Sequence, residues 1–184
     1  MTVYELRADA EGYRWLTMLQ DVDFDALAEL EGVKVGPAWQ RYAVEPIDDD
    51  LNAGKSLSDF PTLGSTPTFS QHAVDALRDM LHANGELLPL TSDAGQFYAY
   101  NVTHVVDALD EHRSEVKRFR DGGIMRVVRY EFRPEIVADL AIFKVSQLTR
   151  GPVFATDVFA KRVREAHLKG FVFEEVWTAE KTER

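Results

Sequence analysis

The sequence predicts an α+β protein with mixed, mainly antiparallel sheets and a few short helices. Short alternating or apolar runs of strand length recur along the chain. Two segments carry the apolar stripe of an amphipathic helix, and each has a capping residue before it and a glycine after it. Strand candidates flank both segments, so the chain is expected to contain two strand–helix–strand units.

The N-terminal part of the chain is expected to form short strands separated by turns. Residues 3–6 alternate in polarity, residues 15–19 are rich in apolar side chains, and residues 38–47 have apolar and aromatic positions at strand-like spacing. Between them, residues 24–30 are long enough only for a short helix, which Gly32 would close.

The longest stretch without hydrophobic periodicity covers residues 48–68. It opens with Asp48, Asp49 and Asp50 and contains several glycines and prolines. We expect a surface loop here, and long loops without secondary structure of their own are often functional.

The first strand–helix–strand unit centres on a helix that begins after Ser70. The Ser70 hydroxyl can accept a hydrogen bond from a free backbone N–H of the first turn. Gly85 is expected to end the helix in the left-handed conformation, and strand candidates follow at 87–90 and 97–101. The apolar stripe of this helix consists of Ala73, Val74, Leu77, Met80 and Leu81.

Three further elements are expected between the two units. A short helix should follow Thr103. Residues 115–119 and 124–132 should pair as a hairpin around the turn Asp121-Gly122-Gly123. Residues 141–145 form another strand candidate.

The second strand–helix–strand unit has a helix that Thr156 or Asp157 would cap, followed by an alternating strand over residues 171–177. Both units have a proline 18 residues before the closing glycine, namely Pro67 before Gly85 and Pro152 before Gly170. The shared spacing suggests an internal duplication. The alternative is that short strand–helix–strand units always look alike.

The composition is that of a globular protein, with 45% hydrophobic and 28% charged residues. The length fits one domain over residues 1–184, or an N-terminal lobe over 1–50 and a main lobe over 51–184 that share a core. The chain has no cysteine, which excludes disulfides and fits a reducing compartment. It shows neither a signal peptide nor an apolar run of membrane-spanning length, so a cytoplasmic location without membrane contact is expected.

The chain is acidic, with 31 acidic and 21 basic residues and a formal net charge of −10. This balance disfavours nucleic acid as a partner, because phosphates must be matched by lysine and arginine. It would instead accelerate association with a basic protein. The alternative explanation is that many bacterial cytosolic proteins are simply acidic.

Two apparent ligand-binding motifs fail at named positions. Residues 52–56 end like a phosphate-binding loop, but Asp49 stands where that loop needs a glycine, and its carboxylate would repel phosphate. Residues 21–25 begin like a calcium loop. That loop requires a glycine and a bidentate glutamate where this chain has Ala26 and Gly32.

The sequence also lacks a recognisable catalytic or metal-binding pattern. The histidines do not have the paired spacing, with an adjacent glutamate, that zinc enzymes use. No Gly-x-Ser-x-Gly motif is present for nucleophilic catalysis. We therefore expect no enzyme activity, no catalytic residue, no metal and no cofactor.

Several stretches of the chain, taken together and in this order, resemble immunity family eleven of bacterial polymorphic toxin systems. The resemblance spans roughly residues 55–177, whereas the N-terminal part is only loosely similar. The stretches that carry it are residues 57–61, 67–70, 73–77, 85–90, 98–103, 105–110, 141–144 and 170–173.

The resemblance implies an α+β protein that is encoded beside a toxin, binds that toxin and blocks its activity. It implies no catalytic residues. It transfers no contact residues either, because immunity proteins differ in the surface that meets their own toxin.

Our hypothesis from the sequence is steric neutralisation of a cognate toxin, and the acidity of the chain suits a basic, nuclease-like toxin. The candidate contact residues are Asp48, Asp49, Asp50 and Asp59 of the loop, with Trp39 as an aromatic anchor beside it. The loop could equally be a solvated linker. A homodimer is also compatible with the sequence.

Two other function classes remain open at this point. One is a small hydrolase or transferase whose site is assembled from distant residues, with Asp59, His104, Asp107 and Asp110 as the first candidates. The other is a regulatory or scaffolding module that recognises a protein of the host cell. Convergence of the four candidates in one deep pocket would favour the enzyme.

Overall fold

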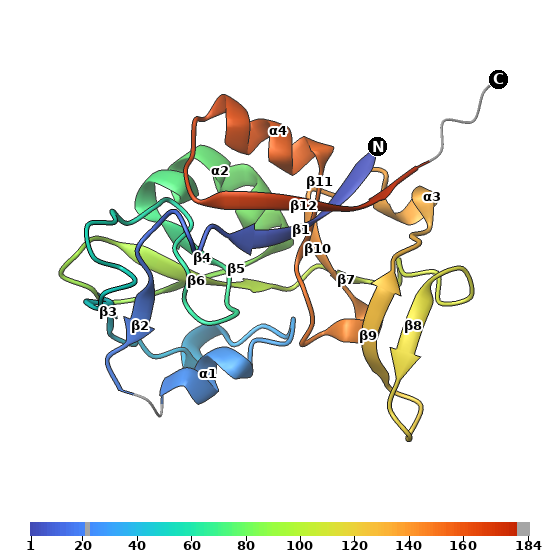
Figure 1. The fold of residues 1–184 in the computed structure, drawn as a ribbon, viewed down its shortest axis with the longest axis horizontal. Coiled ribbons are helices and arrows are strands. Elements are labelled where there is room, and N and C mark those ends of the chain that lie inside the picture. Colours follow the sequence, from blue (N-terminus) through green and yellow to red (C-terminus); the bar gives the residue numbers. More distant parts are fainter. Residues whose placement is uncertain (21–22, 180–184) are drawn as a thin grey trace.

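The structure is a computed structural model that describes residues 1–20 and 23–179 (Figure 1). It has the predicted α+β architecture, with mainly antiparallel sheets and short helices. The calcium-loop pattern begins at Asp21 and Val22, which lie outside the described residues.

The largest sheet has five strands in the order β12-β1-β11-β10-β7. All its pairs are antiparallel except β10 with β7. The N-terminal strand lies between two C-terminal strands, so the sheet joins the two ends of the chain. The strands are β1 (Thr2–Ala8), β7 (Val105–Val106), β10 (Ile142–Val145), β11 (Phe154–Thr156) and β12 (Phe171–Thr178).

A second sheet has the order β4-β6-β5, and its three strands are also antiparallel. The helix α2 connects its two outer strands. The elements are β4 (Thr68–Ser70), α2 (Gln71–Asn84), β5 (Gly85–Pro89) and β6 (Phe97–Val102).

The two predicted strand–helix–strand units are both present, and they share one topology. In the first unit, β4 and β5 flank β6; in the second, β11 and β12 flank β1. Ser70 caps α2 by accepting from the Ala73 amide at 3.1 Å, and Thr156 caps α4 (Asp157–Glu165) by accepting from the Val158 amide at 3.3 Å. The shared topology is compatible with the duplication hypothesis, which stays a prediction.

The two unit helices pack side by side (Figure 1). Arg162 of α4 reaches both carboxylate oxygens of Asp79 on α2, at 2.8 and 3.0 Å. A hydrophobic cluster fills the space between the units. It contains Phe69, Leu77 and Leu81 from the first unit and Phe159 and Val163 from the second.

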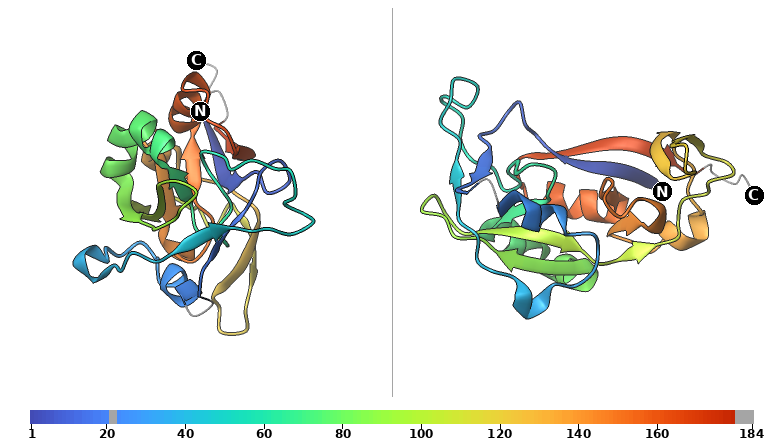
Figure 2. Two further views of the ribbon diagram at one scale, coloured as in Figure 1. Left: turned by 90° about the vertical axis from the view of Figure 1, so that its left-hand side faces the viewer. Right: turned by 90° about the horizontal axis from the view of Figure 1, so that it is seen from below.

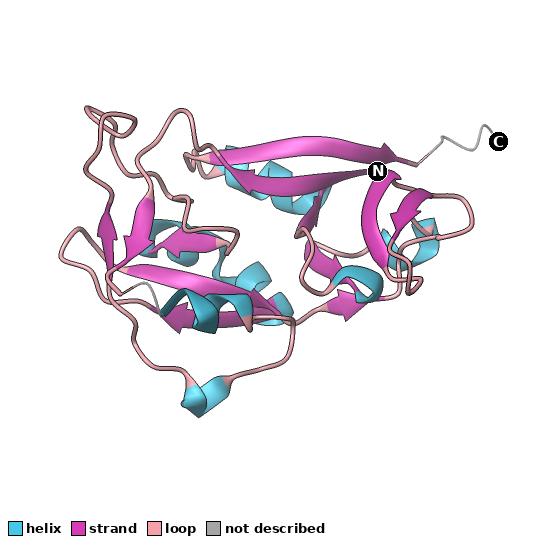
Figure 3. Ribbon diagram, turned by 60° about the horizontal axis from the view of Figure 1, so that its bottom comes forward, coloured by secondary structure: helices cyan, strands magenta, loops and turns pink. Residues whose placement is uncertain are grey.

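The smaller elements lie at the two ends of the molecule. The ribbon of β2 (Leu16–Met18) and β3 (Val44–Pro46) is at one end, and the hairpin of β8 (Glu115–Arg118) and β9 (Ile124–Arg129) is at the other (Figure 3). Two short α-helices and two 3-10 turns complete the described part of the fold. These are α1 (Phe24–Ala28), η2 (Gly36–Ala38), α3 (Pro134–Val137) and η3 (Ser146–Leu148).

Two local expectations are wrong. The short helix expected after Thr103 is absent from that described segment, where β7 instead pairs in parallel with β10. Gly85 ends α2, but with φ −175° and ψ −168°, which is extended rather than left-handed. A Cβ there would lie 2.4 Å from the Asn101 carbonyl oxygen and 2.6 Å from the Tyr100 ring. Glycine is therefore required by space and not by backbone conformation.

Candidate functional site

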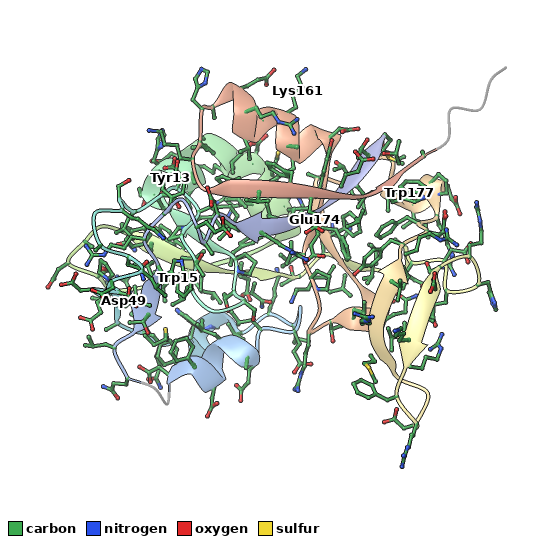
Figure 4. All side chains as sticks on the ribbon, in the orientation of Figure 1. Tyr13, Trp15, Asp49, Lys161, Glu174 and Trp177 are labelled. Atoms are coloured by element: carbon green, nitrogen blue, oxygen red, sulfur yellow. The ribbon has the colours of Figure 1, made fainter. Side chains whose placement is uncertain are left out.

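The three aspartates Asp48, Asp49 and Asp50, here called the acidic turn, lie at one end of the long axis, where Figure 4 labels Asp49. All three are exposed. The Asp48 side chain is 92% exposed and pairs with Arg14 at 3.1 Å. The turn therefore presents negative charge to solvent.

The acidic turn is held in place by one buried residue, Asn52. The Asn52 side chain donates to Asp49 Oδ1 at 2.7 Å and accepts from the Trp15 amide at 3.0 Å. The hydrogen bond from the Asn52 side chain lowers the pKa of Asp49 below its ordinary value. Asn52 thus links the acidic turn to the chain before β2, while the three carboxylates stay exposed.

Asp59 has a different environment from the acidic turn. Its side chain is 16% exposed and is in hydrogen-bond contact with three other residues. One oxygen accepts from the Ser70 hydroxyl at 3.0 Å and contacts His72 Nδ1 at 2.9 Å, while the other accepts from the Lys169 amide at 2.9 Å. This carboxylate links the loop to both strand–helix–strand units, through Ser70 and His72 of the first and Lys169 of the second.

Trp39 is not placed beside the acidic turn. Its indole N–H donates to the Pro89 carbonyl at 3.0 Å, and its ring packs edge to face on Tyr42 at 4.8 Å. Figure 2 shows η2, which ends just before Trp39, and the loop of the acidic turn projecting to opposite sides of the molecule. The structure therefore does not combine the two into one surface.

Trp39 instead lines a groove beside β5. A cavity of about 490 Å³ and one of about 400 Å³ share Arg41, His82, Leu87 and Pro89 among their lining residues. Lys34 extends the first cavity and Arg78 the second. Most of the lining is uncharged; its charged residues are the three cations Lys34, Arg41 and Arg78 and the carboxylate Glu86.

A third cavity, of about 500 Å³, opens between β1 and the loop that precedes β4. Its walls are mostly apolar, and the charges at its rim are already paired. Arg7 pairs with Glu5 at 2.8 Å, and Arg150 pairs with Glu31. We find no chemistry in this cavity that identifies a ligand.

The β8–β9 hairpin is a further surface that sequence reasoning missed. Its strands pair in antiparallel register, with Lys117 opposite Arg126. Phe119, Met125 and Val128 are large apolar side chains that are 53%, 51% and 47% exposed. The signal in the sequence was the run Lys117-Arg118-Phe119-Arg120, in which cations alternate with an aromatic ring next to a hairpin turn.

The four residues proposed for an enzyme do not meet in one cavity. His104 contacts the Asn84 side chain at 2.6 Å, and Asp107 accepts from Arg133 at 2.7 Å. Asp110 accepts from the amides of the turn that follows it. None of these residues, nor Asp59, lines any of the three cavities. The convergence that would favour the enzyme hypothesis is not found for this set.

Within residues 1–20 and 23–179, no three histidine, aspartate or glutamate side chains are grouped so that they could hold a metal ion. Over the same ranges, no helix combines the length and the apolar character needed to cross a membrane.

Residues 88–178 match the model of the immunity protein family (Imm11). The matched part runs from the end of β5 through β12 and contains the β8–β9 hairpin and the whole second strand–helix–strand unit. The match confirms the resemblance, although it begins well after residue 55. The acidic turn, Trp39 and Asp59 lie outside it. No curated protein matches the chain.

Proposed function

We propose that this chain, whose residues 88–178 match the immunity protein family Imm11, binds a cognate bacterial toxin and neutralises it by steric occlusion. The family match is the observation that carries the proposal. We further propose that the toxin belongs to a polymorphic toxin system and that neutralisation takes place in the cytoplasm, without catalysis by this chain.

Occlusion requires an interface of ordinary size. A specific complex buries about 1,600 Å² in total, or about 800 Å² on each partner. The described surface offers ordered, exposed features on which such an interface could be built, including the acidic turn. If the interface covers the toxin's active site or substrate path, no chemistry by this chain is needed.

The net charge of −10 supports a basic toxin, for which a nuclease is one example. Opposite net charges accelerate the encounter of two proteins, and salt weakens this effect. In this proposal Asp48, Asp49 and Asp50 of the acidic turn are the contacts for such a toxin, because all three are exposed. The part that Trp39 and Asp59 play in binding remains a proposal from the sequence.

The test is co-expression with the toxin domain encoded beside this gene. The toxin alone should arrest bacterial growth, and this chain should restore growth. A D48N/D50N variant should bind the toxin more slowly at low salt while remaining folded. Continued growth arrest with well-expressed wild-type protein would contradict the proposed function.

A further inference from the structure

The β8–β9 hairpin has the opposite charge from the rest of the molecule. From residue 113 to residue 130 there are six arginines and lysines and two carboxylates, a net charge of +4. Since the whole chain carries −10, the remainder carries −14. The positive charge of this segment is therefore concentrated on one projecting ribbon (Figure 1).

Three of the six cations form ion pairs with carboxylates of the described chain. Arg113 and Arg129 both pair with Glu131, which also accepts from the Trp177 indole at 3.1 Å. Arg118 pairs with Glu111 at 2.6 Å. These contacts fix the hairpin to the body of the protein.

Three other cations of the hairpin have no such role. Lys117, Arg120 and Arg126 are exposed, and none of them forms an ion pair or a side-chain hydrogen bond with another described residue. Lys117 and Arg126 are directly opposite each other on the two strands. Like charges in this position destabilise an antiparallel pair. The hairpin therefore contains a destabilising pair of like charges, whereas a carboxylate in place of either Lys117 or Arg126 would stabilise it.

Exposed apolar groups accompany these cations. The register of the hairpin shifts on either side of the Lys117–Arg126 pair, which leaves Met125 and Val128 as the extra residues of β9. Both are about half exposed, and so is Phe119 next to the turn. Cations that surround exposed apolar groups are typical of a protein-binding surface with hot-spot character.

We propose that this surface of the hairpin, formed by Lys117, Arg120 and Arg126 with Phe119, Met125 and Val128, docks on an acidic, partly apolar patch of the cognate toxin. The assignment rests on the proposed function. It is independent of the acidic turn, which lies at the other end of the molecule (Figures 1 and 4). A toxin of any net charge can carry such a local patch.

A protein fits this surface better than a nucleic acid does. The −14 of the remaining chain would repel a polyanion that extends beyond the hairpin. Aliphatic side chains such as Met125 and Val128 also match an apolar protein surface rather than a phosphate backbone. A carboxylate patch on a protein is local, so it can meet the hairpin while avoiding the acidic remainder.

The decisive experiment uses charge reversal with two readouts, thermal stability and the Kd for the toxin domain encoded beside this gene. K117E places a glutamate opposite Arg126, so the melting temperature should rise by about 2 °C. The same change should weaken toxin binding at least tenfold, as expected for loss and reversal of a complementary charge. Greater stability with weaker binding cannot arise from misfolding.

Two variants complete the design. K117E/R126E restores a like-charge pair, so the gain in stability should vanish while binding weakens further. K161E makes the same charge change on α4, at a distance from the hairpin (Figure 4), and should bind like the wild type. An M125S/V128S variant should also bind more weakly, because it removes the apolar part of the surface.

The outcomes separate the two proposals. If the wild-type chain does not bind the toxin, the proposed function fails. If the wild type binds and K117E/R126E binds equally well, only the hairpin assignment is overturned. A hairpin variant that retains toxin binding but loses self-association or binding to an RNA oligonucleotide would likewise overturn it.

Discussion

Asp59 and Lys169 are 110 residues apart and exchange two hydrogen bonds. The Asp59 amide donates to the Lys169 carbonyl at 3.1 Å, and the Lys169 amide donates to the Asp59 carboxylate at 2.9 Å. The same carboxylate accepts from Ser70, the cap of α2. One side chain thus joins the loop, the start of α2 and the turn after α4.

Replacing Asp59 with asparagine should destabilise the fold. The amide cannot accept on both of its side-chain atoms, so a donor is left without a partner at a cost of about 1–3 kcal/mol. The free energy of unfolding from urea titration measures the loss. Unchanged stability of D59N would show that the junction has no structural role.

The acid dependence of stability gives an independent check on Asp59. Burial raises the pKa of this carboxyl, but hydrogen bonds from Lys169, His72 and Ser70 outweigh it, and the pKa is lowered overall. Because the folded-state pKa lies below the unfolded value, this stabilisation is present above about pH 4 and is lost as the pH falls further. The D59N variant should lack this part of the acid dependence between pH 5 and pH 2.

Replacing Gly85 with alanine should be severe despite the ordinary backbone angles. The new methyl group would overlap the Asn101 carbonyl and the Tyr100 ring, whose hydroxyl donates to the Leu81 carbonyl at 2.8 Å. We expect a loss of about 2 kcal/mol or more, as for other overpacked sites. The matched control is Gly123, where a methyl group would lie 3.3 Å from an Asp121 side-chain oxygen and 3.9 Å from the Phe119 ring, without overlap. Similar losses for G85A and G123A would contradict the steric explanation.

Asn52 should control the ionisation of the acidic turn. In N52A the side-chain hydrogen bond to Asp49 is removed, while the backbone amide of residue 52 can still donate to it, so the pKa of Asp49 should rise part of the way towards its ordinary value. An NMR titration of the carboxyl carbon measures this shift directly. A pKa of Asp49 that is equally low in N52A would mean that another group stabilises its charge.

Tyr130 should make the fold sensitive to alkali. It packs against Phe132 and Phe154, and burial, with a contribution from nearby Glu5, raises its pKa to about 12. Because the folded-state pKa lies above the unfolded value of about 10, stability from the neutral phenol is complete below pH 10 and falls between pH 10 and pH 12. Urea titrations at pH 9 and pH 11 should show a smaller loss for Y130F than for the wild type. Equal losses would contradict this role.

Local sequence signals were sufficient for the elements that depend on local contacts. The caps Ser70 and Thr156 and the hairpin turn at Asp121 are found where the pattern predicted them. The strand at Val105 and Val106 was not predicted from local signals. It forms by pairing with β10, which follows about forty residues later in the chain. The backbone conformation of Gly85 was wrongly predicted for a similar reason, since the neighbours that require a glycine there, Tyr100 and Asn101, lie on another strand.

The candidate contact surface was predictable only in part. Loop composition correctly indicated that Asp48, Asp49 and Asp50 are exposed. Loop composition did not indicate that Asp59, in the same loop, accepts a hydrogen bond from the backbone amide of Lys169, which lies near the C-terminal end of the sequence. The cations of the hairpin were visible in the sequence, but the opposition of Lys117 and Arg126 depends on a register with two irregularities. Such a register is set by packing rather than by local preference.

In the proposed function, this chain forms a specific complex with its cognate toxin. Purified wild-type protein should be titrated into the toxin domain encoded beside its gene, with stoichiometry and Kd measured by calorimetry and complex mass by light scattering. We expect a 1:1 complex with a Kd well below about 1 μM and loss of toxin activity at one equivalent. No heat of binding and no complex at micromolar concentration, with both proteins folded, would contradict it.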